Sequence, residues 1–153
     1  MSKQSQKYHL NLAGEFFVAA ELHRLGIAAA VTYGNAKEAD VVLLSKTGDK
    51  AVVVEVKCTS QPQWVVGGTV PIPSSKPWVF VYLPSEQIEA PHYYVMSQAE
   101  LHSIVSPADT EYRRRFREKR GIEYGDRRGV VNLKRSQAEP YLNAWKTITS
   151  QIT

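Results

Sequence analysis

The sequence predicts an α/β fold in which a β-sheet is flanked by helices and followed by a helical C-terminal part. Short apolar runs such as Ala51–Val54 and Trp78–Leu83 are rich in β-branched and aromatic residues, which is typical of buried strands. A longer apolar segment from about His9 to Leu25 has the pattern of a buried helix, and Gly26 is its expected stop.

Composition limits the protein classes to which the chain can belong. The chain has 153 residues, of which 43% are hydrophobic and 22% charged, as in folded globular proteins. No apolar run is long enough to cross a bilayer, and no signal-peptide pattern is present, so we expect a cytoplasmic protein without a membrane partner. A single cysteine, Cys58, excludes an internal disulfide framework and a Cys-rich zinc module.

We expect residues 1–153 to form a single domain. Its polar N-terminus, residues 1–8, is expected to be flexible. Residues 107–153 are expected to form a mostly helical, basic C-terminal part.

Five strands are expected along the chain: Ala28–Tyr33, Asp40–Ser45, Ala51–Lys57, Pro77–Leu83 and His92–Met96. A turn around Gly34–Asn35 separates the first two. Thr47–Lys50 is a tight hairpin signal, because Gly48 can take the positive φ that a two-residue turn needs. Residues 58–76 are broken by glycines and prolines, so no long helix is expected there.

Three features predict helices in the C-terminal half. Ser97 and Glu100 form a capping-box pattern, in which each side chain satisfies an exposed backbone N–H at a helix start. A helix is expected near residues 109–120, ended by Gly121. A last helix is expected from Pro140 to Ile148, where apolar residues form one stripe.

Positive charge is concentrated in one segment. The net charge is +4, but residues 113–135 hold ten Lys/Arg and three Asp/Glu, a local charge of +7. Such a segment suits a polyanionic partner, since Lys and Arg contacts to phosphates release counterions. The candidate nucleic-acid-binding residues are Arg113, Arg114, Arg115, Arg117, Lys119 and Arg120. A solvated helix face, or a contact with the acidic surface of another subunit, is the alternative interpretation.

The hairpin formed by residues 40–57 carries the chemical signal. With a two-residue loop at Gly48–Asp49, Asp40 lies opposite Lys57, and Val42 lies opposite Glu55. Opposed residues share a face of the sheet, as do residues two apart on one strand. Asp40, Glu55 and Lys57 are therefore expected to project from one face.

Two carboxylates and an ammonium group on one face favour metal-assisted chemistry. Carboxylate oxygens are the ligands that Mg²⁺ or Mn²⁺ prefers, and Lys57 can orient an attacking water or neutralise charge on a phosphate. The alternative is a structural salt bridge between Asp40 and Lys57, with Glu55 solvated at a sheet edge.

Glu15 is the candidate fourth member of this site. At about 100° per residue it shares a helix face with Leu12, Val18 and Leu22, which predicts an inward-pointing carboxylate. The alternative is a side chain that reaches solvent past Gly14.

The arrangement resembles the PD-(D/E)xK nuclease superfamily. The resemblance lies in Glu15 on an opening helix, Asp40 at a strand start and Glu55-Val56-Lys57 on the next strand. It implies a restriction-endonuclease-like mixed β-sheet flanked by helices. It also implies that Asp40, Glu55 and the backbone carbonyl of Val56 ligate Mg²⁺ or Mn²⁺, that Lys57 assists the attacking water, and that Glu15 completes the catalytic site. Homodimerisation is common in this superfamily, so a homodimer is a further expectation.

The chain also resembles, over most of its length, a family of small bacterial proteins with this domain. The matching stretches are Gly14–Leu22, Tyr33–Asp40, Trp78–Leu83 and Pro140–Trp145. One departure from the literal motif is Ala39, which stands where the motif has proline.

The resemblance implies a divalent-metal-dependent endonuclease that hydrolyses phosphodiester bonds, most often in DNA. The alternative function is a catalytically silent nucleic-acid-binding or protein-interaction module on the same fold. An intact set of Asp40, Glu55 and Lys57 favours the nuclease, because a binding module does not need it.

Overall fold

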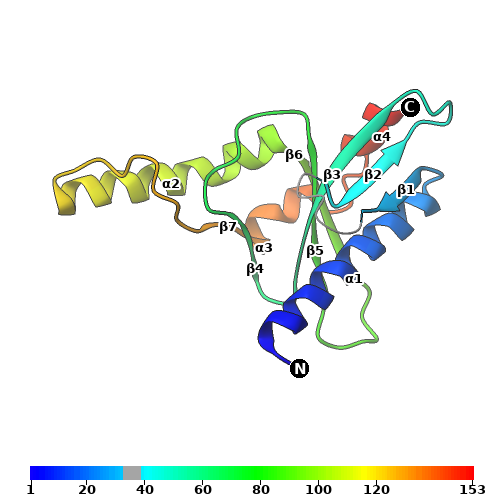
Figure 1. The fold of residues 1–153 in the computed structure, drawn as a ribbon, viewed down its shortest axis with the longest axis horizontal. Helices are drawn as coiled ribbons and strands as arrows, with labels where there is room; N and C mark the ends of the chain where they lie inside the picture. The colour runs from blue at the N-terminus through cyan, green and yellow to red at the C-terminus, as the bar shows by residue number, and fades with distance from the viewer. Residues whose placement is uncertain (33–38) are drawn as a thin grey trace.

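A computed structural model describes residues 1–32 and 39–153 and shows a mixed α/β fold. Its main sheet has five strands in the order β1-β2-β3-β5-β6 (Figure 1). The strands are β1 (Ala28–Val31), β2 (Val41–Leu44), β3 (Ala51–Thr59), β5 (Pro77–Tyr82) and β6 (His92–Ser97). Only β3 and β5 pair in parallel among these neighbours, so the sheet is mixed, which confirms the predicted fold class.

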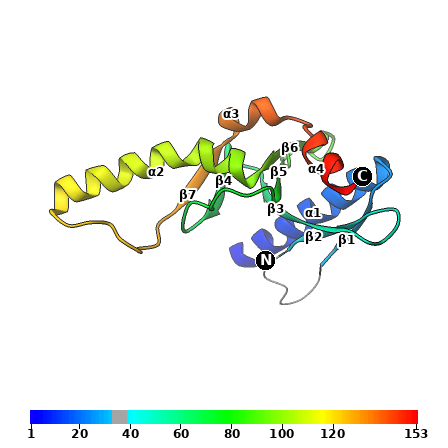
Figure 2. The same cartoon turned by 90° about the horizontal axis from the view of Figure 1, so that it is seen from above.

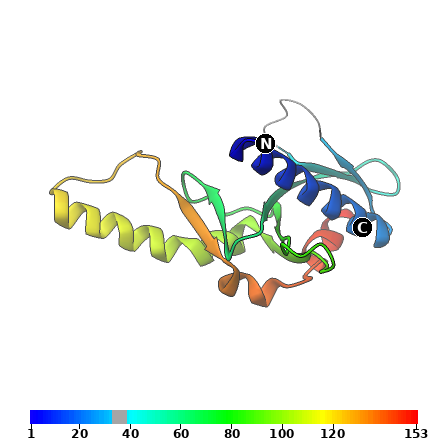
Figure 3. The same ribbon diagram turned by 90° about the horizontal axis from the view of Figure 1, so that it is seen from below.

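A second, two-stranded sheet was not predicted. It consists of β4 (Gln63–Gly67) and β7 (Val131–Lys134), which pair antiparallel and which we call the ribbon. Figure 3 shows the two strands, coloured green and orange, side by side. Residues 58–76 contain no helix, as expected, but β7 places a strand inside the segment expected to be mostly helical.

Each face of the main sheet has its own apolar core. On one face, α1 (Lys3–Arg24) and α4 (Lys146–Ile152) pack Val18, Leu22 and Ile148 against the valines of β3 and β5. On the other face, the ribbon and α2 (Gln98–Arg120) cover Phe80 and Tyr94. Burial of apolar surface on both faces is the main stabilising contribution to such a layered fold.

Helix α1 begins earlier than expected. Ser2 caps it by accepting a hydrogen bond from the Ser5 N–H at 3.1 Å, and the helix starts at Lys3. Most of the N-terminal segment expected to be flexible is therefore helical. Gly26, with φ of 77°, follows the helix as predicted. Strand β1 ends at Val31, while Tyr33 and the turn predicted around Gly34–Asn35 lie outside the described residues.

Helix α2 confirms the capping box and the Gly121 stop. The Ser97 side chain accepts from the Glu100 N–H and the Glu100 side chain accepts from the Ser97 N–H, while Gly121 has φ of 70°. The helix is continuous between these two signals and contains Pro107. Figure 2 shows that its second half extends away from the sheet and that residues 121–130 return along it to β7.

The expected helix from Pro140 to Ile148 is wrong. The chain instead forms α3 (Arg135–Ala138), a 3₁₀ turn (Glu139–Tyr141) and, after a break, α4. In the break, Asn143 takes a positive φ of 54° and its N–H donates to the Tyr93 carbonyl at 2.8 Å. The Asn143 N–H therefore bonds to β6 and not to a carbonyl of the helix that the apolar stripe had predicted. In the described residues, no helix is long and apolar enough to cross a membrane.

Candidate functional site

Strand β3 changes its pairing partner at the predicted site. Residues 51–54 pair antiparallel with β2, whereas residues 55–59 pair in parallel with β5. Strand β2 begins at Val41, opposite Val54, so it does not extend along the second half of β3. Glu55 and Lys57 lie just beyond this change, where side chains from outside the sheet can approach β3.

The predicted hairpin register is wrong by two residues. Val42 pairs with Val53, not with Glu55, and the strands close where the Ser45 N–H donates to the Lys50 carbonyl. The loop is longer than expected because Asp49 accepts a hydrogen bond from the Ser45 hydroxyl at 2.8 Å. A slip of two residues preserves the face on which each side chain lies, so the expected common face of Asp40, Glu55 and Lys57 is unaffected.

Asp40 is held beside β3 through two hydrogen bonds. Its N–H donates to the Val54 carbonyl at 3.2 Å, and its carboxylate accepts from the Val56 N–H at 2.8 Å. Burial raises the pKa of Asp40, and the bond from Val56 opposes that rise. Since the N–H and C=O of a strand residue point to the same edge, the Val56 carbonyl also faces the Asp40 side.

Glu55 lies between two lysines. Its carboxylate is 3.5 Å from the Lys57 ammonium and 2.9 Å from the Lys76 ammonium. Both ammonium groups also lie near the face of Trp78, at 5.9 and 6.0 Å from the ring centroid. The alternative interpretation of the sequence was a salt bridge between Asp40 and Lys57. Among the described residues, both lysines pair with Glu55 instead.

Lys76 was missed by the sequence reasoning. It directly precedes β5, and the parallel register of Glu55 with Trp78 brings it beside Glu55 across a separation of 21 residues. If the sequence-based prediction had paired the apolar strands at residues 51–57 and 77–83 in parallel, it would have placed Lys76 near Glu55.

Glu15 reaches the site because α1 packs closely on β3. Gly14 faces Cys58, and a Cβ added to Gly14 would lie 2.6 Å from the Cys58 Cβ, too close for any other residue without a shift. Burial raises the pKa of Glu15 to about 7, with further contributions from the negative charges of Asp40 and Glu55. This coupling indicates that the three carboxyl groups lie in one electrostatic environment.

The four predicted residues are thus brought to one region, but they do not form a closed ligand cluster. Within residues 1–32 and 39–153, no group of three or more His, Cys, Asp or Glu side chains is arranged to hold a metal ion. Cys58 packs against α1, and burial raises the pKa of its thiol to about 12, which opposes a role as a nucleophile at neutral pH.

Most cations predicted to bind nucleic acid have acidic partners on α2 or in the segment that follows it. The pairs are Arg113 with Asp109, Arg114 with Glu111 and Glu118, Arg115 with Glu111, and Arg117 with Glu123. Hydrogen bonds from Arg114 and Arg115 lower the pKa of Glu111 to about 2. Lys119 and Arg120 have no ion pair within the described residues. The positive potential of α2 is therefore smaller than its arginine content suggests.

No protein-family model and no curated protein sequence matches the chain. Among solved structures, the fold is similar to that of a bacterial homing endonuclease, I-Ssp6803I. The alignment covers 94% of this chain and 93% of that chain, with 13% sequence identity and a TM-score of 0.56. At this sequence identity the similarity shows a shared fold and nothing more. An endonuclease therefore adopts the same fold as this chain.

Proposed function

We propose that the protein is a divalent-metal-dependent endonuclease of the PD-(D/E)xK type that hydrolyses phosphodiester bonds in DNA. The observation that carries the proposal is that Asp40 is hydrogen-bonded to β3 at Val56, beside the Glu55–Lys57 pair, while Glu15 on α1 is electrostatically coupled to all three side chains. The sequence resemblance and the fold shared with an endonuclease support it.

The donor set suits a hard cation. The negative charges of Asp40 and Glu55 contribute to the raised pKa of Glu15, which means that the three carboxylates repel when ionised. A divalent cation relieves that repulsion. Asp40, Glu55 and the Val56 carbonyl would hold Mg²⁺ or Mn²⁺, with Glu15 as an additional ligand. When bound, the metal would polarise a phosphate oxygen and lower the pKa of a coordinated water.

The two lysines have different roles in this proposal. Lys57 lies on the common face with its side chain 33% exposed, so its ammonium group can contact substrate, orient the attacking water and neutralise charge on the phosphate. Lys76 forms the shorter contact with Glu55 and is a positioning residue, because it fixes the direction of that carboxylate.

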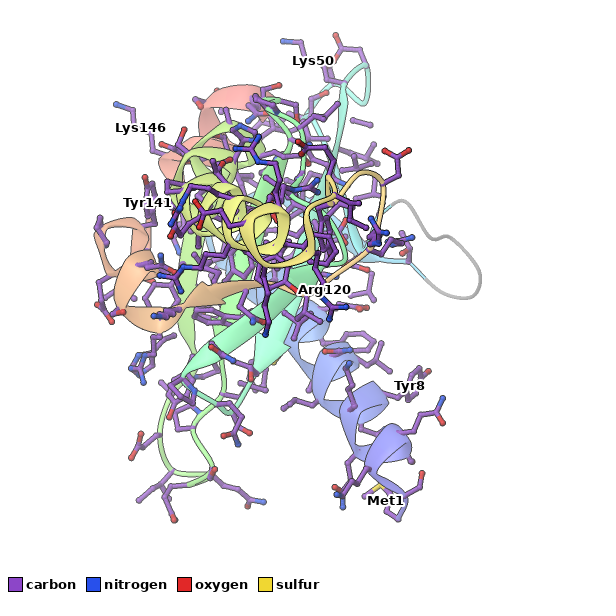
Figure 4. The ribbon with its side chains drawn as sticks, turned by 90° about the vertical axis from the view of Figure 1, so that its left-hand side faces the viewer. Met1, Tyr8, Lys50, Arg120, Tyr141 and Lys146 are labelled. Atoms are coloured by element: carbon purple, nitrogen blue, oxygen red, sulfur yellow. The ribbon has the colours of Figure 1, made fainter. Side chains whose placement is uncertain are left out.

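Cleavage assays test the proposal. Supercoiled plasmid, single-stranded DNA and RNA are incubated with wild type, Lys57→Ala and Lys146→Ala, each with Mg²⁺, Mn²⁺ or chelator. Lys146 is an exposed lysine on α4 that points away from the body (Figure 4), so its variant is the matched control. We expect metal-dependent DNA cleavage by wild type and the control, and loss of it in Lys57→Ala. Equal activity of all three proteins would contradict the proposal.

One observation favours the second candidate, a catalytically silent nucleic-acid-binding module. Glu55 already has two ammonium partners, which reduces the need for a metal at that carboxylate. Binding of DNA without cleavage in any of the metals would favour this module over the nuclease.

A further inference from the structure

The outer face of the ribbon carries three polar side chains and one valine at regular positions. Gln63 pairs with Lys134, and Val65 pairs with Asn132, so the four side chains share one face. All four are exposed. The two amide side chains have no hydrogen-bond partner within the described residues, so their donors and acceptors are available to a ligand.

The inner face of the ribbon is fixed to the core. Trp64 is 1% exposed, packs edge-on against Phe80 and Tyr94, and donates its indole N–H to the Val81 carbonyl at 2.9 Å. This burial excludes base stacking by Trp64. The ribbon therefore presents its outer side chains on a rigid support.

The outer face has the chemistry of a base-reading surface. Gln and Asn amides can each form two hydrogen bonds with adenine, Lys donates to guanine, and an apolar side chain contacts the thymine methyl group. A two-stranded ribbon also fits the width of the major groove of B-DNA, about 12 Å. Strands are used in this way by β-ribbon DNA-binding proteins.

Charge around the ribbon is complementary to DNA. Residues 124–135 hold four Lys/Arg and one Asp/Glu, a net charge of +3, whereas residues 109–123 hold six Lys/Arg and four Asp/Glu, or +2 over a longer stretch. Arg128 packs over Gly68 at the end of the ribbon and has no ion pair within the described residues. A pocket of about 660 Å³ beside β7 is lined by Arg128, Lys134 and the Arg113–Asp109 pair among others, so its walls carry a net positive charge.

The ribbon is directly connected to the candidate site. Strand β3 continues from Lys57 to Thr59, and three residues then lead to Gln63 at the start of β4. Six residues of chain span at most about 20 Å, less than one helical turn of B-DNA, about 34 Å. Glu55 pairs with Trp78 and Lys57 with Phe80, whose side chains lie in the core beneath the ribbon. These two site residues therefore lie on the ribbon's side of the sheet, whereas Glu15 approaches from α1 on the opposite face.

We propose that the β4–β7 ribbon enters the major groove of duplex DNA and that Gln63, Val65, Asn132 and Lys134 determine which base sequence the protein binds. Arg128 contacts the flanking phosphates. The inference rests on the proposed function for its substrate class, but base reading by the ribbon does not require turnover. In this proposal the principal DNA contact is the ribbon and not the arginines of α2, which pair with acidic residues.

Selection from a random duplex library tests base reading without cleavage. Wild-type protein is bound to the library in chelator and, separately, in Ca²⁺, and the bound duplexes are sequenced. We expect an enriched motif. Asn132→Ala and Gln63→Ala should each lose the preference at one or two motif positions, by roughly 10- to 100-fold in relative affinity. Gln87→Ala, at an exposed glutamine on the loop between β5 and β6, should leave the motif unchanged.

Each outcome separates the two proposals. An enriched motif that both ribbon variants leave unchanged, or binding to RNA in preference to duplex DNA, would overturn base reading by the ribbon. Motif binding that depends on Asn132 and Gln63, without plasmid cleavage in any metal, would support the ribbon and contradict the nuclease. Metal-dependent cleavage without any enriched motif would support the nuclease and overturn the ribbon inference. Circular dichroism of each variant, expected to match wild type, shows that altered selection is not loss of fold.

Discussion

Replacing Glu15 with glutamine should stabilise the metal-free protein at high pH. Burial and the charges of Asp40 and Glu55 raise the folded-state pKa of Glu15 from 4.5 to about 7. A carboxyl group with a raised folded pKa contributes stability below its unfolded pKa, and this contribution is lost as pH rises towards the folded pKa. At pH 8 the ionised group therefore opposes folding, and Glu15→Gln removes that cost.

The magnitude follows from the shift. A change from 4.5 to about 7 corresponds to at most roughly 3 kcal/mol, and solvent screening of this half-buried side chain reduces it to about 1–2 kcal/mol. For a chain of this length, that is a rise in Tm of about 3–6 °C at pH 8. At pH 4, where the carboxyl group is protonated in both states, the variant and wild type should differ little.

Thermal unfolding followed by circular dichroism measures this effect at pH 4, 6 and 8 in chelator. Glu21→Gln is the matched control, since Glu21 lies on the same helix and pairs with the exposed Arg24 side chain, and its replacement should change stability by about 0–1 kcal/mol. Added Mg²⁺ or Mn²⁺ should stabilise wild type more than Glu15→Gln at pH 8, because the metal binds the folded state and glutamine lacks the negative charge of the proposed Glu15 ligand. A variant less stable than wild type at pH 8 in chelator would refute the reasoning.

Three further changes test the packing, the site and the ribbon. Gly14→Ala should destabilise the protein by about 1–3 kcal/mol in urea unfolding, because its new Cβ would meet Cys58; an unchanged midpoint would show that α1 does not pack this closely. Lys76→Ala should slow DNA cleavage under single-turnover conditions, and Lys76→Arg should restore part of the rate; wild-type rates in both would contradict its contact with Glu55. Arg128→Ala should weaken duplex binding at all sequences and reduce the slope of log affinity against log salt by about 1; an unchanged slope would exclude a phosphate contact.

Local sequence signals predicted most of the elements. The five strands of the main sheet, the capping box at Ser97 and the stops at Gly26 and Gly121 depend on residues close together in the chain, where alternation, capping and positive φ act directly. The expected helix at Pro140–Ile148 failed because Asn143 bonds to β6, a partner distant in sequence.

The candidate site was predictable in part for the same reason. The common face of Asp40, Glu55 and Lys57 follows from the two-residue period of a strand, so the error in register does not change it. Which residue of β3 lies opposite each residue of β2 depended instead on the side-chain hydrogen bonds of the loop at Asp49. Lys76 required knowledge that β3 and β5 run in parallel.

The sequence by itself determined the five strands of the main sheet, the helix stops at Gly26 and Gly121, and the side of β3 on which the candidate catalytic groups lie, because each depends on neighbours within a few residues. Only the tertiary structure decided how close Glu15 comes to Asp40, since that depends on the contact of Gly14 with Cys58 between α1 and β3. It also decided that β4 pairs with β7 across more than sixty residues and creates the ribbon. Pairing over such separations is set by the burial of Trp64 and Leu133 in a shared core, and no local pattern specifies it.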